Sequence, residues 1–218
     1  MDLKGKKIAF LGDSITEGVG ASSPENRYVN VFSKMADCQV INLGRSGTRL
    51  AKQIQPTIDF PSFDEHFSLR IEKIPEDIDI IVVFGGVNDF LHGDAPFGTY
   101  GDATVDTFCG AIYNLFLTLY QKFPQALIVD MTPLHNIHEL SLEKNGQKRE
   151  HTFIEYVKII KETCAFFSIP VLDLYSSSNM QPLVKENNKT YFADGLHPND
   201  VGHKNIAERL VAFLRCMK

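Results

Sequence analysis

The stretch Ile8-Ala9-Phe10-Leu11-Gly12-Asp13-Ser14-Ile15-Thr16 decides the fold, because a continuous apolar run ends abruptly in a polar turn. Apolar residues that do not alternate with polar ones predict a strand buried on both faces, as in a parallel sheet. Parallel strands need long crossover connections, which are usually helices. The stretch therefore predicts an α/β domain in which Ser14 lies just beyond the carboxyl end of the first strand.

Four more short β-branched runs have the same continuous character. They lie at residues 40–43, 78–84, 127–129 and 171–174. Helical patterns of apolar residues separate them, at residues 28–35, 63–74, 105–123, 153–167 and 206–213. The second helix is expected to open with a capping box formed by Ser62 and Glu65. Strands that alternate with helices in this way predict a three-layer α/β/α domain with one parallel sheet.

The length and charge of the chain limit the classes of protein that it can belong to. Its 218 residues are enough for one sizeable hydrophobic core, and no linker-like stretch divides them, so we expect a single domain over residues 1–218. The net charge of -5 at pH 7 argues against a nucleic-acid partner, since binding to a phosphate backbone depends on clustered Lys and Arg. Two short basic runs, at residues 4–7 and 147–149, are expected to be solvated surface.

The cysteines and the apolar runs indicate the cellular compartment in which the protein is expected. Cys38, Cys109, Cys164 and Cys216 are widely spaced and form no C-x-x-C pair, so neither a zinc knuckle nor a disulfide framework is indicated. The four apolar residues before Gly12 are too few for a signal-peptide core. No later stretch approaches the roughly 20 apolar residues of a membrane span. The expectation is a cytoplasmic protein with reduced thiols and no membrane partner.

Candidate site residues follow the predicted strands directly. Ser14 follows the first strand, Gly44 follows the second in Asn42-Leu43-Gly44-Arg45-Ser46-Gly47-Thr48, and Asn88 follows the third in Gly85-Gly86-Val87-Asn88-Asp89. Ligands of parallel α/β sheets bind at the carboxyl ends of the strands, so these residues are expected to meet at one edge. Alone, each has an ordinary explanation, as a helix N-cap, a glycine-rich turn and a turn asparagine.

The segment Asp194-Gly195-Leu196-His197-Pro198 places an imidazole three residues after a carboxylate. A carboxylate at this spacing can orient the histidine, which can then take the proton of a serine hydroxyl. Capping of a helix that begins near Asn199 is the structural alternative for the pair. Together with Ser14, the pair indicates hydrolysis by a serine nucleophile.

With these four blocks in order, from residue 8 to about residue 203, the sequence resembles the SGNH hydrolases, the GDSL-type esterases and lipases, with Ile15 where the name has Leu. The resemblance implies a flavodoxin-like sheet of five parallel strands in the order 2-1-3-4-5. It implies that Ser14 is the nucleophile, His197 the base and Asp194 the acid that orients the base. The oxyanion hole would consist of the backbone N–H groups of Ser14 and Gly44 and the side chain of Asn88. No G-x-S-x-G elbow surrounds Ser14, which argues against an α/β-hydrolase of the usual lipase type.

Substrate recognition is expected from residues near the same edge. Asp13 and Arg45 lie next to the predicted nucleophile and oxyanion residues, and Phe97 and Tyr100 lie in a long connection after Asn88. A structural salt bridge is the alternative for Arg45, and packing onto the domain is the alternative for the two aromatic side chains. A second long connection, residues 134–149, also follows a strand, and functional loops accumulate at such places.

These features predict a carboxylic-ester hydrolase that works through an acyl-enzyme and needs neither a cofactor nor a metal. It is expected to remove a short acyl group, such as acetyl, from a small or carbohydrate-like alcohol. A thioesterase or a lysophospholipase of the same fold is the alternative, because a fold does not determine a substrate. The sequence leaves the oligomeric state open.

Two interpretations from other classes stay open. A flavodoxin-like phosphate-binding module would use the hydroxyl-rich loop at residues 12–20, although neither the P-loop pattern nor G-x-G-x-x-G is present. Such a module would not need the pair of Asp194 and His197. A metal hydrolase would draw its ligands from the histidines His135, His138, His151, His197 and His203.

Overall fold

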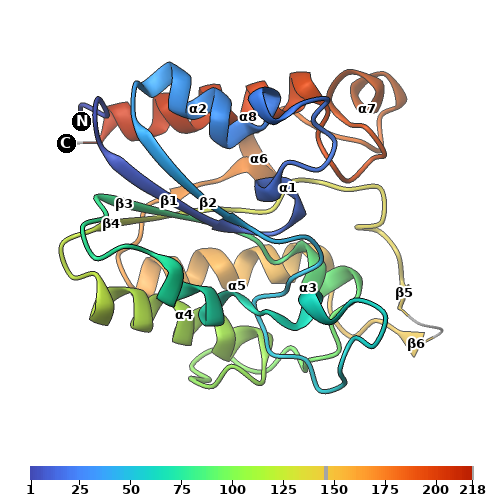
Figure 1. Ribbon diagram of the computed structural model, residues 1–218. Coiled ribbons are helices and arrows are strands. Elements are labelled where there is room, and N and C mark those ends of the chain that lie inside the picture. Colours follow the sequence, from blue (N-terminus) through green and yellow to red (C-terminus); the bar gives the residue numbers. More distant parts are fainter. Residues whose placement is uncertain (145–146, 218) are drawn as a thin grey trace.

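A five-stranded parallel sheet forms the centre of the molecule, with helices on both of its faces (Figure 1). The computed structural model describes residues 1–144 and 147–217. The strands stand in the order β2-β1-β3-β4-β7, which is 2-1-3-4-5 in chain order within this sheet and confirms the predicted topology. Two residues of the connection at 134–149, Asn145 and Gly146, lie outside the described residues.

The strands end together at one edge of the sheet. They are β1 (Lys7–Gly12), β2 (Gln39–Gly44), β3 (Ile80–Phe84), β4 (Leu127–Met131) and β7 (Val171–Leu172). In the register of the sheet, Gly12 is paired with Gly44 on one side and with Phe84 on the other. The loops after β1, β2 and β3 therefore begin side by side, at what we call the carboxyl edge.

Two layers of helices cover the sheet, with α2 and α8 on one face and α4 and α5 on the other (Figure 1). Alternate residues of β1 point to opposite faces, so Ile8 and Phe10 pack into one apolar cluster while Ala9 and Leu11 pack into the other. The helices are α1 (Ser14–Glu17), α2 (Tyr28–Ala36), α3 (Val87–Leu91), α4 (Phe108–Lys122), α5 (Phe153–Phe166), α6 (Leu174–Ser177), α7 (Lys185–Tyr191) and α8 (Asp200–Cys216). Three 3₁₀ turns, η1 (Pro24–Asn26), η2 (Pro61–Asp64) and η3 (Phe67–Lys73), and a small hairpin of β5 (Glu143–Lys144) and β6 (Gln147–Lys148) complete the described elements.

The prediction of a helix that opens with a capping box at Ser62 is wrong. The segment consists of the two 3₁₀ turns η2 and η3, and no side chain caps either of them. Ser62 lies inside η2, whose N-cap is Phe60, and the Glu65 carboxylate faces Arg45 at 4.0 Å and Lys73 at 3.7 Å. A true capping box is present at the start of α5, between Thr152 and Glu155.

Two predicted boundaries shift because side chains cap helices there. The strand expected at residues 171–174 ends at Leu172, since Asp173 accepts a hydrogen bond from the Ser176 N–H (3.1 Å) and starts α6. The helix expected from residue 105 begins at Phe108, after its N-cap Thr107. Within the described residues, no helix combines the length and apolar character that crossing a membrane requires.

Candidate active site

Ser14 is the first residue of α1, immediately after the loop that leaves β1. The N-cap of α1 is Asp13, whose carboxylate accepts a hydrogen bond from the Ile15 N–H at 3.0 Å. The capping role expected as the alternative for Ser14 is therefore taken by its neighbour. The Ser14 hydroxyl is left to face the C-terminal segment of the chain.

The side chains of Ser14, His197 and Asp194 form one hydrogen-bonded chain. The Ser14 Oγ lies 3.0 Å from the His197 Nε2, and the His197 Nδ1 lies 2.7 Å from the Asp194 Oδ2. The other oxygen of Asp194 accepts the backbone N–H groups of Leu196 (2.9 Å) and His197 (2.7 Å). These distances fit a serine, a base and an orienting carboxylate, which is the arrangement that the sequence predicts.

The charge of Asp194 is stabilised by these bonds. Burial alone would raise its pKa, but the hydrogen bonds from the His197 side chain and from the two backbone N–H groups outweigh it, so the pKa lies below its usual value. The carboxylate is therefore ionised at neutral pH, as an acid that holds an imidazole must be.

A tight turn positions the histidine. The Ala193 N–H donates to the His197 carbonyl (2.8 Å), and Gly195 adopts a φ of 84° that favours glycine. The connection after β4 supports the turn, because the Ile137 N–H donates to the Gly195 carbonyl at 3.1 Å. A β-carbon at Gly195 would lie 2.6 Å from the Ile137 side chain, so this contact has no room for a larger residue.

Gly44 is the last residue of β2, and its backbone N–H is already engaged. It donates to the Asn42 Oδ1 at 2.8 Å, while the Asn42 amide donates to the Thr16 carbonyl at 2.8 Å. A β-carbon at Gly44 would lie 2.1 Å from the Glu17 nitrogen, so the glycine allows β2 to pack against α1. This packing role of Gly44 was not predicted, although the Asn42 to Gly44 spacing of an Asx turn could have signalled it.

Gly47, three residues later, has a backbone N–H without an acceptor among the described residues. It is buried and has a φ of 72°, and a β-carbon there would lie 2.3 Å from the Phe63 ring. The Ser14 N–H likewise has no acceptor in the described part of the chain. Two unused backbone donors therefore lie in the loops that follow β1 and β2.

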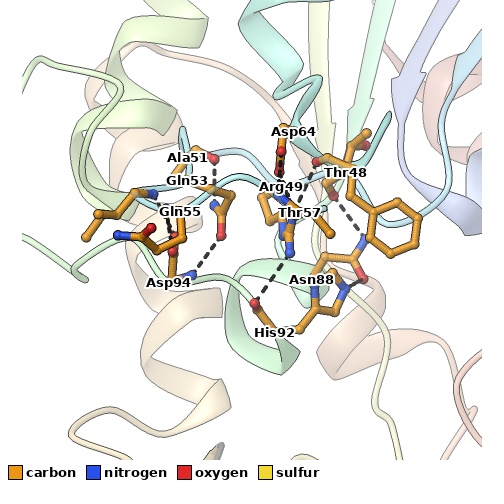
Figure 2. A network of polar contacts seen from close by, with 12 residues as sticks. Thr48, Arg49, Ala51, Gln53, Gln55, Thr57, Asp64, Asn88, His92 and Asp94 are labelled. Atoms are coloured by element: carbon orange, nitrogen blue, oxygen red, sulfur yellow. Dashed lines mark hydrogen bonds and ion pairs between the residues drawn. The ribbon is translucent and has the colours of Figure 1, made fainter. Parts of the chain in front are cut away.

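Asn88 lies in the first turn of α3 and is 4% exposed. Its amide nitrogen donates to the Thr48 carbonyl at 2.9 Å, and its Oδ1 lies 3.0 Å from the His92 Nε2 (Figure 2). These two contacts fix the orientation of the amide. An amide nitrogen carries two hydrogens, so a second donor remains beyond the one that Thr48 accepts.

The four residues expected at the substrate differ in their surroundings, and of these four Asp13 alone lines the crevice that adjoins the nucleophile loop. Asp13 is 2% exposed and serves as a cap, and Arg45 faces Glu65 at 4.0 Å. Phe97 packs onto the domain against Phe108, Tyr156 and His151. Tyr100 lines a separate pocket formed with α4 and α5, and none of the triad or oxyanion residues lines it.

A narrow crevice adjoins the nucleophile loop. It encloses about 230 Å³ out to its mouth, yet it has no space wide enough for a free water molecule. Its walls are apolar apart from Asp13 and come from four loops: Asp13, Ile15, Phe84, Gly85, Val87, Pro133, Leu134 and Leu196. The crevice thus runs between Asp13, the residue before Ser14, and Leu196, the residue before His197.

The residues behind the two alternative interpretations are engaged elsewhere. In the hydroxyl-rich loop, Thr16 is fully buried and its hydroxyl lies 2.9 Å from that of Tyr28. His135 pairs with Glu139 (2.8 Å), and His203 contacts the Val19 carbonyl (3.2 Å). No group of three or more His, Cys, Asp or Glu side chains in residues 1–144 and 147–217 is arranged to hold a metal ion.

Comparison with known proteins gives a family and a set of similar structures. Residues 10–204 match the model of the GDSL-like Lipase/Acylhydrolase family. A protein from Lactobacillus plantarum is 30% identical, with 99% of each chain covered and a TM-score of 0.83. The acetyl xylan esterase AlAXEase is 20% identical over 94% of this chain and 98% of its own, with a TM-score of 0.61. A two-domain esterase active on acetylated mannans is 20% identical over 97% of this chain and 49% of its own, with a TM-score of 0.59.

The family match covers the whole carboxyl edge. It includes the loops after β1, β2 and β3 and the turn at residues 194–197. The two esterases, each 20% identical to this chain, show the fold alone. Comparison with the curated proteins gave no match. On the family match, the chain belongs to the GDSL-like lipase/acylhydrolase family and is a carboxylic-ester hydrolase.

Proposed function

We propose that the protein hydrolyses esters through an acyl-enzyme on Ser14 and removes short acyl groups, such as acetyl, from a small or carbohydrate-like alcohol. The observation that carries the proposal is the continuous chain from the Ser14 Oγ through the His197 ring to the Asp194 carboxylate, with links of 3.0 and 2.7 Å. An alcohol is a poor nucleophile at neutral pH, so the adjacent base is what makes attack feasible.

The reaction follows from these contacts. His197 Nε2 takes the Ser14 proton as Oγ attacks the ester carbonyl carbon, and Asp194 stabilises the imidazolium that forms. Collapse of the tetrahedral intermediate breaks the bond to the leaving alcohol, which receives the proton from His197. Water then attacks the acyl-Ser14 ester with His197 again as base, releasing the carboxylic acid and restoring the serine.

The oxyanion donors belong to three loops. The Ser14 N–H and the second amide hydrogen of Asn88 are two of them. For the loop after β2 we propose the Gly47 N–H in place of Gly44, whose N–H is held by Asn42 at 2.8 Å. A donor of this kind contributes roughly 3–4 kcal/mol to the transition state in related acyl transfer.

The narrowness of the crevice beside Ser14 supports a short acyl group. A methyl group is wider than a water molecule, so even acetyl needs Leu134 and Leu196 to move apart a little, and a longer chain needs a larger movement. Dense packing makes such movements costly. The acetyl esterases among the similar structures are consistent with this choice, although the fold alone does not select it.

Kinetics of Ser14→Ala test the function. Turnover of p-nitrophenyl acetate is expected to fall on the order of a million-fold, as in comparable triads, while the circular dichroism spectrum is retained. A folded Ser14→Ala protein with wild-type turnover would refute the nucleophile assignment.

A substrate panel tests the specificity. It crosses acyl lengths of two to twelve carbons with four leaving groups: nitrophenol, a sugar hydroxyl, the glycerophosphocholine of a lysophospholipid and the thiol of coenzyme A. The kcat/KM is expected to be highest for acetyl, and Leu134→Ala is expected to shift the optimum to longer chains. Highest kcat/KM for the lysophospholipid or the thioester would favour those alternatives.

A further inference from the structure

Arg70 is a buried arginine that reaches the carboxyl edge from η3. It is 2% exposed, and its side chain lies over the Phe67 ring with the guanidinium carbon 4.6 Å from the ring centroid. Its acceptors belong to the ends of β1 and β2 and to the loop after β2, the segments that carry the nucleophile and the proposed oxyanion donors. No interpretation of the sequence gave this residue a role.

Each hydrogen bond of Arg70 holds a different part of that edge. Nη1 donates to the carbonyls of Gly12 (2.7 Å) and Leu43. Gly12 lies two residues before Ser14, and the Leu43 carbonyl shares a rigid peptide plane with the Gly44 N–H. Nη2 donates to the Thr48 Oγ1 at 3.0 Å.

Thr48 extends this arrangement to the third oxyanion loop. Its hydroxyl accepts from Arg70 and donates to the Arg45 carbonyl at 2.8 Å, which closes the turn that contains Gly47. Its own carbonyl accepts the amide of Asn88 at 2.9 Å. One guanidinium is thus linked, directly or through Thr48, to all three loops that supply oxyanion donors.

The acceptors of Arg70 are all neutral. Among the described residues, no carboxylate lies within ion-pair distance of its guanidinium. Burial lowers the pKa of Arg70 to about 10, while the charges of Asp13, Glu65 and Glu17 oppose that decrease, so the group is positively charged at neutral pH. Its field reaches the catalytic loop: burial raises the pKa of Asp13, and the charges of His197 and Arg70 oppose that rise.

We propose that Arg70 is a positioning residue for ester hydrolysis, which holds the oxyanion loops in register and places beside them a positive charge that no carboxylate of the described residues contacts. The proposal rests on the proposed function. Negative charge develops on the carbonyl oxygen in the transition state, and a fixed buried cation stabilises that charge without having to reorient. Because the substrate itself is neutral, the effect belongs to kcat rather than to KM.

The test compares Arg70→Met with Arg49→Met, its matched control. Arg49 is a second buried guanidinium, 5% exposed, that contacts the Asp64 carboxylate. Rates are divided by the concentration of active sites, titrated with a fluorophosphonate that labels Ser14. Per active site, Arg70→Met is expected to lower kcat on the order of 10²- to 10³-fold with KM within about threefold. For Arg49→Met, kcat per active site is expected to stay within about threefold.

Binding of a boronic acid gives a readout that a purely structural role would not move. Boronic acids form an anionic tetrahedral adduct with the serine, so Arg70→Met is expected to weaken their affinity in proportion to the loss of kcat. Wild-type kcat per active site and wild-type boronate affinity in Arg70→Met would overturn the proposal.

Two milder variants keep the test decisive if Arg70→Met does not fold. Arg70→Lys keeps the charge with fewer bonds, and Thr48→Val removes one acceptor of the guanidinium. Each is expected to lower kcat per active site by about three- to tenfold, the range for loss of one hydrogen bond. Wild-type kcat in both would overturn the proposal, provided that Ser14→Ala abolishes turnover. Turnover that survives Ser14→Ala would instead refute the proposed function, and this inference with it.

Discussion

Arg49 and Arg70 are two buried arginines in neighbouring regions, and their guanidinium groups have different hydrogen-bond and ion-pair partners. Arg49 contacts the Asp64 carboxylate (3.3 Å), the Thr57 hydroxyl (3.2 Å) and the His92 carbonyl (3.4 Å), in a network that ties the loop after β2 to α3 (Figure 2). Among the described residues, Arg70 donates to two carbonyls and one hydroxyl. Both guanidinium groups lose hydration on folding, but in this part of the chain Arg49 gains a contacting carboxylate and Arg70 does not.

The difference separates structural from functional use of a buried charge. A carboxylate partner neutralises a buried guanidinium, so little of its field remains at a distance. Two carbonyls and a hydroxyl hold the second guanidinium, and Asp13, the charge that acts on it most strongly, makes no ion pair with it, so more of its field remains to act on a reaction that creates an anion. We therefore expect changes around Arg70 to affect rate and changes around Arg49 to affect stability.

The largest effect is expected on the catalytic side of this comparison, at Asp194. Asp194→Asn keeps the shape of the side chain but cannot stabilise an imidazolium, so kcat should fall on the order of 10⁴-fold, as in comparable triads. The side chain is 54% exposed, so the free energy of unfolding should change by less than about 1 kcal/mol. Steady-state kinetics and urea unfolding measure the two quantities. Unchanged kcat would mean that Ser14 and His197 work as a dyad.

The opposite pattern is expected at Asp64. Asp64→Asn leaves the Arg49 charge without its contacting carboxylate and cannot accept from both the Thr57 N–H (2.7 Å) and the Thr57 hydroxyl (2.6 Å). Because Asp64 is 30% exposed, the expected loss of unfolding free energy is about 1–3 kcal/mol, between the values for surface and buried pairs. kcat per active site should stay within about threefold of wild type.

Asp106→Asn is the control for this prediction. Asp106 pairs with Lys52 at 3.8 Å, and both side chains are at least 60% exposed. Its loss should change the unfolding free energy by no more than about 0.5 kcal/mol. A large loss of kcat in Asp64→Asn without a loss of stability would contradict the division between the two regions.

The smallest effect is a dependence of stability on pH that the two regions share. Burial raises the pKa of Asp13, beside Arg70, and of Asp89, on the Arg49 side, to about 6 in each case. The folded state therefore binds these protons more tightly than the unfolded state, where the ordinary value is 3.8. Their stabilising contribution is full at low pH and is lost as the pH rises through about 6.

Thermal unfolding checks this sign. Between about pH 7.5 and pH 5.5 the Tm is expected to rise by about 2–4 °C. Below about pH 4 it should fall, as groups such as Asp79, whose pKa is lowered by the hydrogen bond from Lys6, become protonated. Asp13→Asn retains an oxygen for the Ile15 N–H and should flatten the rise. A Tm that falls steadily from pH 7.5 to 5.5 would exclude this assignment.

The sequence predicts the sheet well because its strands carry continuous apolar runs, which only a doubly covered parallel sheet can bury. Ser14 could be proposed because it follows such a strand, and Asp194 and His197 because they form a short motif before a helix start; the structure brings the three together, and their roles stay a prediction. The prediction of a helix at residues 63–74 failed. Ser62 and Glu65 have the spacing of a capping box, but Ser62 lies inside η2 and Glu65 faces Arg45 and Lys73.

Other features depend on contacts between segments far apart in the chain. The close packing of Gly44 against α1 and the positive φ of Gly47 beside Phe63 follow from contacts of this kind. Arg70 reaches Gly12 across 58 positions of the chain, and nothing in its neighbours' sequence marks it. Phe97 and Tyr100 were assigned by loop length alone, which does not give the direction of a side chain.

The contact between Ile137 and Gly195 couples the connection after β4, where substrate recognition can vary, to the position of the catalytic histidine. The connection after β4 is long, and its outer part can vary without disturbing the sheet. The start of the connection, however, holds the turn that directs His197 toward Ser14. The Ile137 N–H donates to the Gly195 carbonyl at 3.1 Å, and a β-carbon on Gly195 would lie 2.6 Å from the Ile137 side chain. A library of variants that diversifies this connection to change the substrate should therefore keep Ile137 fixed. Substitutions beyond Ile137 can change substrate recognition without changing the orientation of His197.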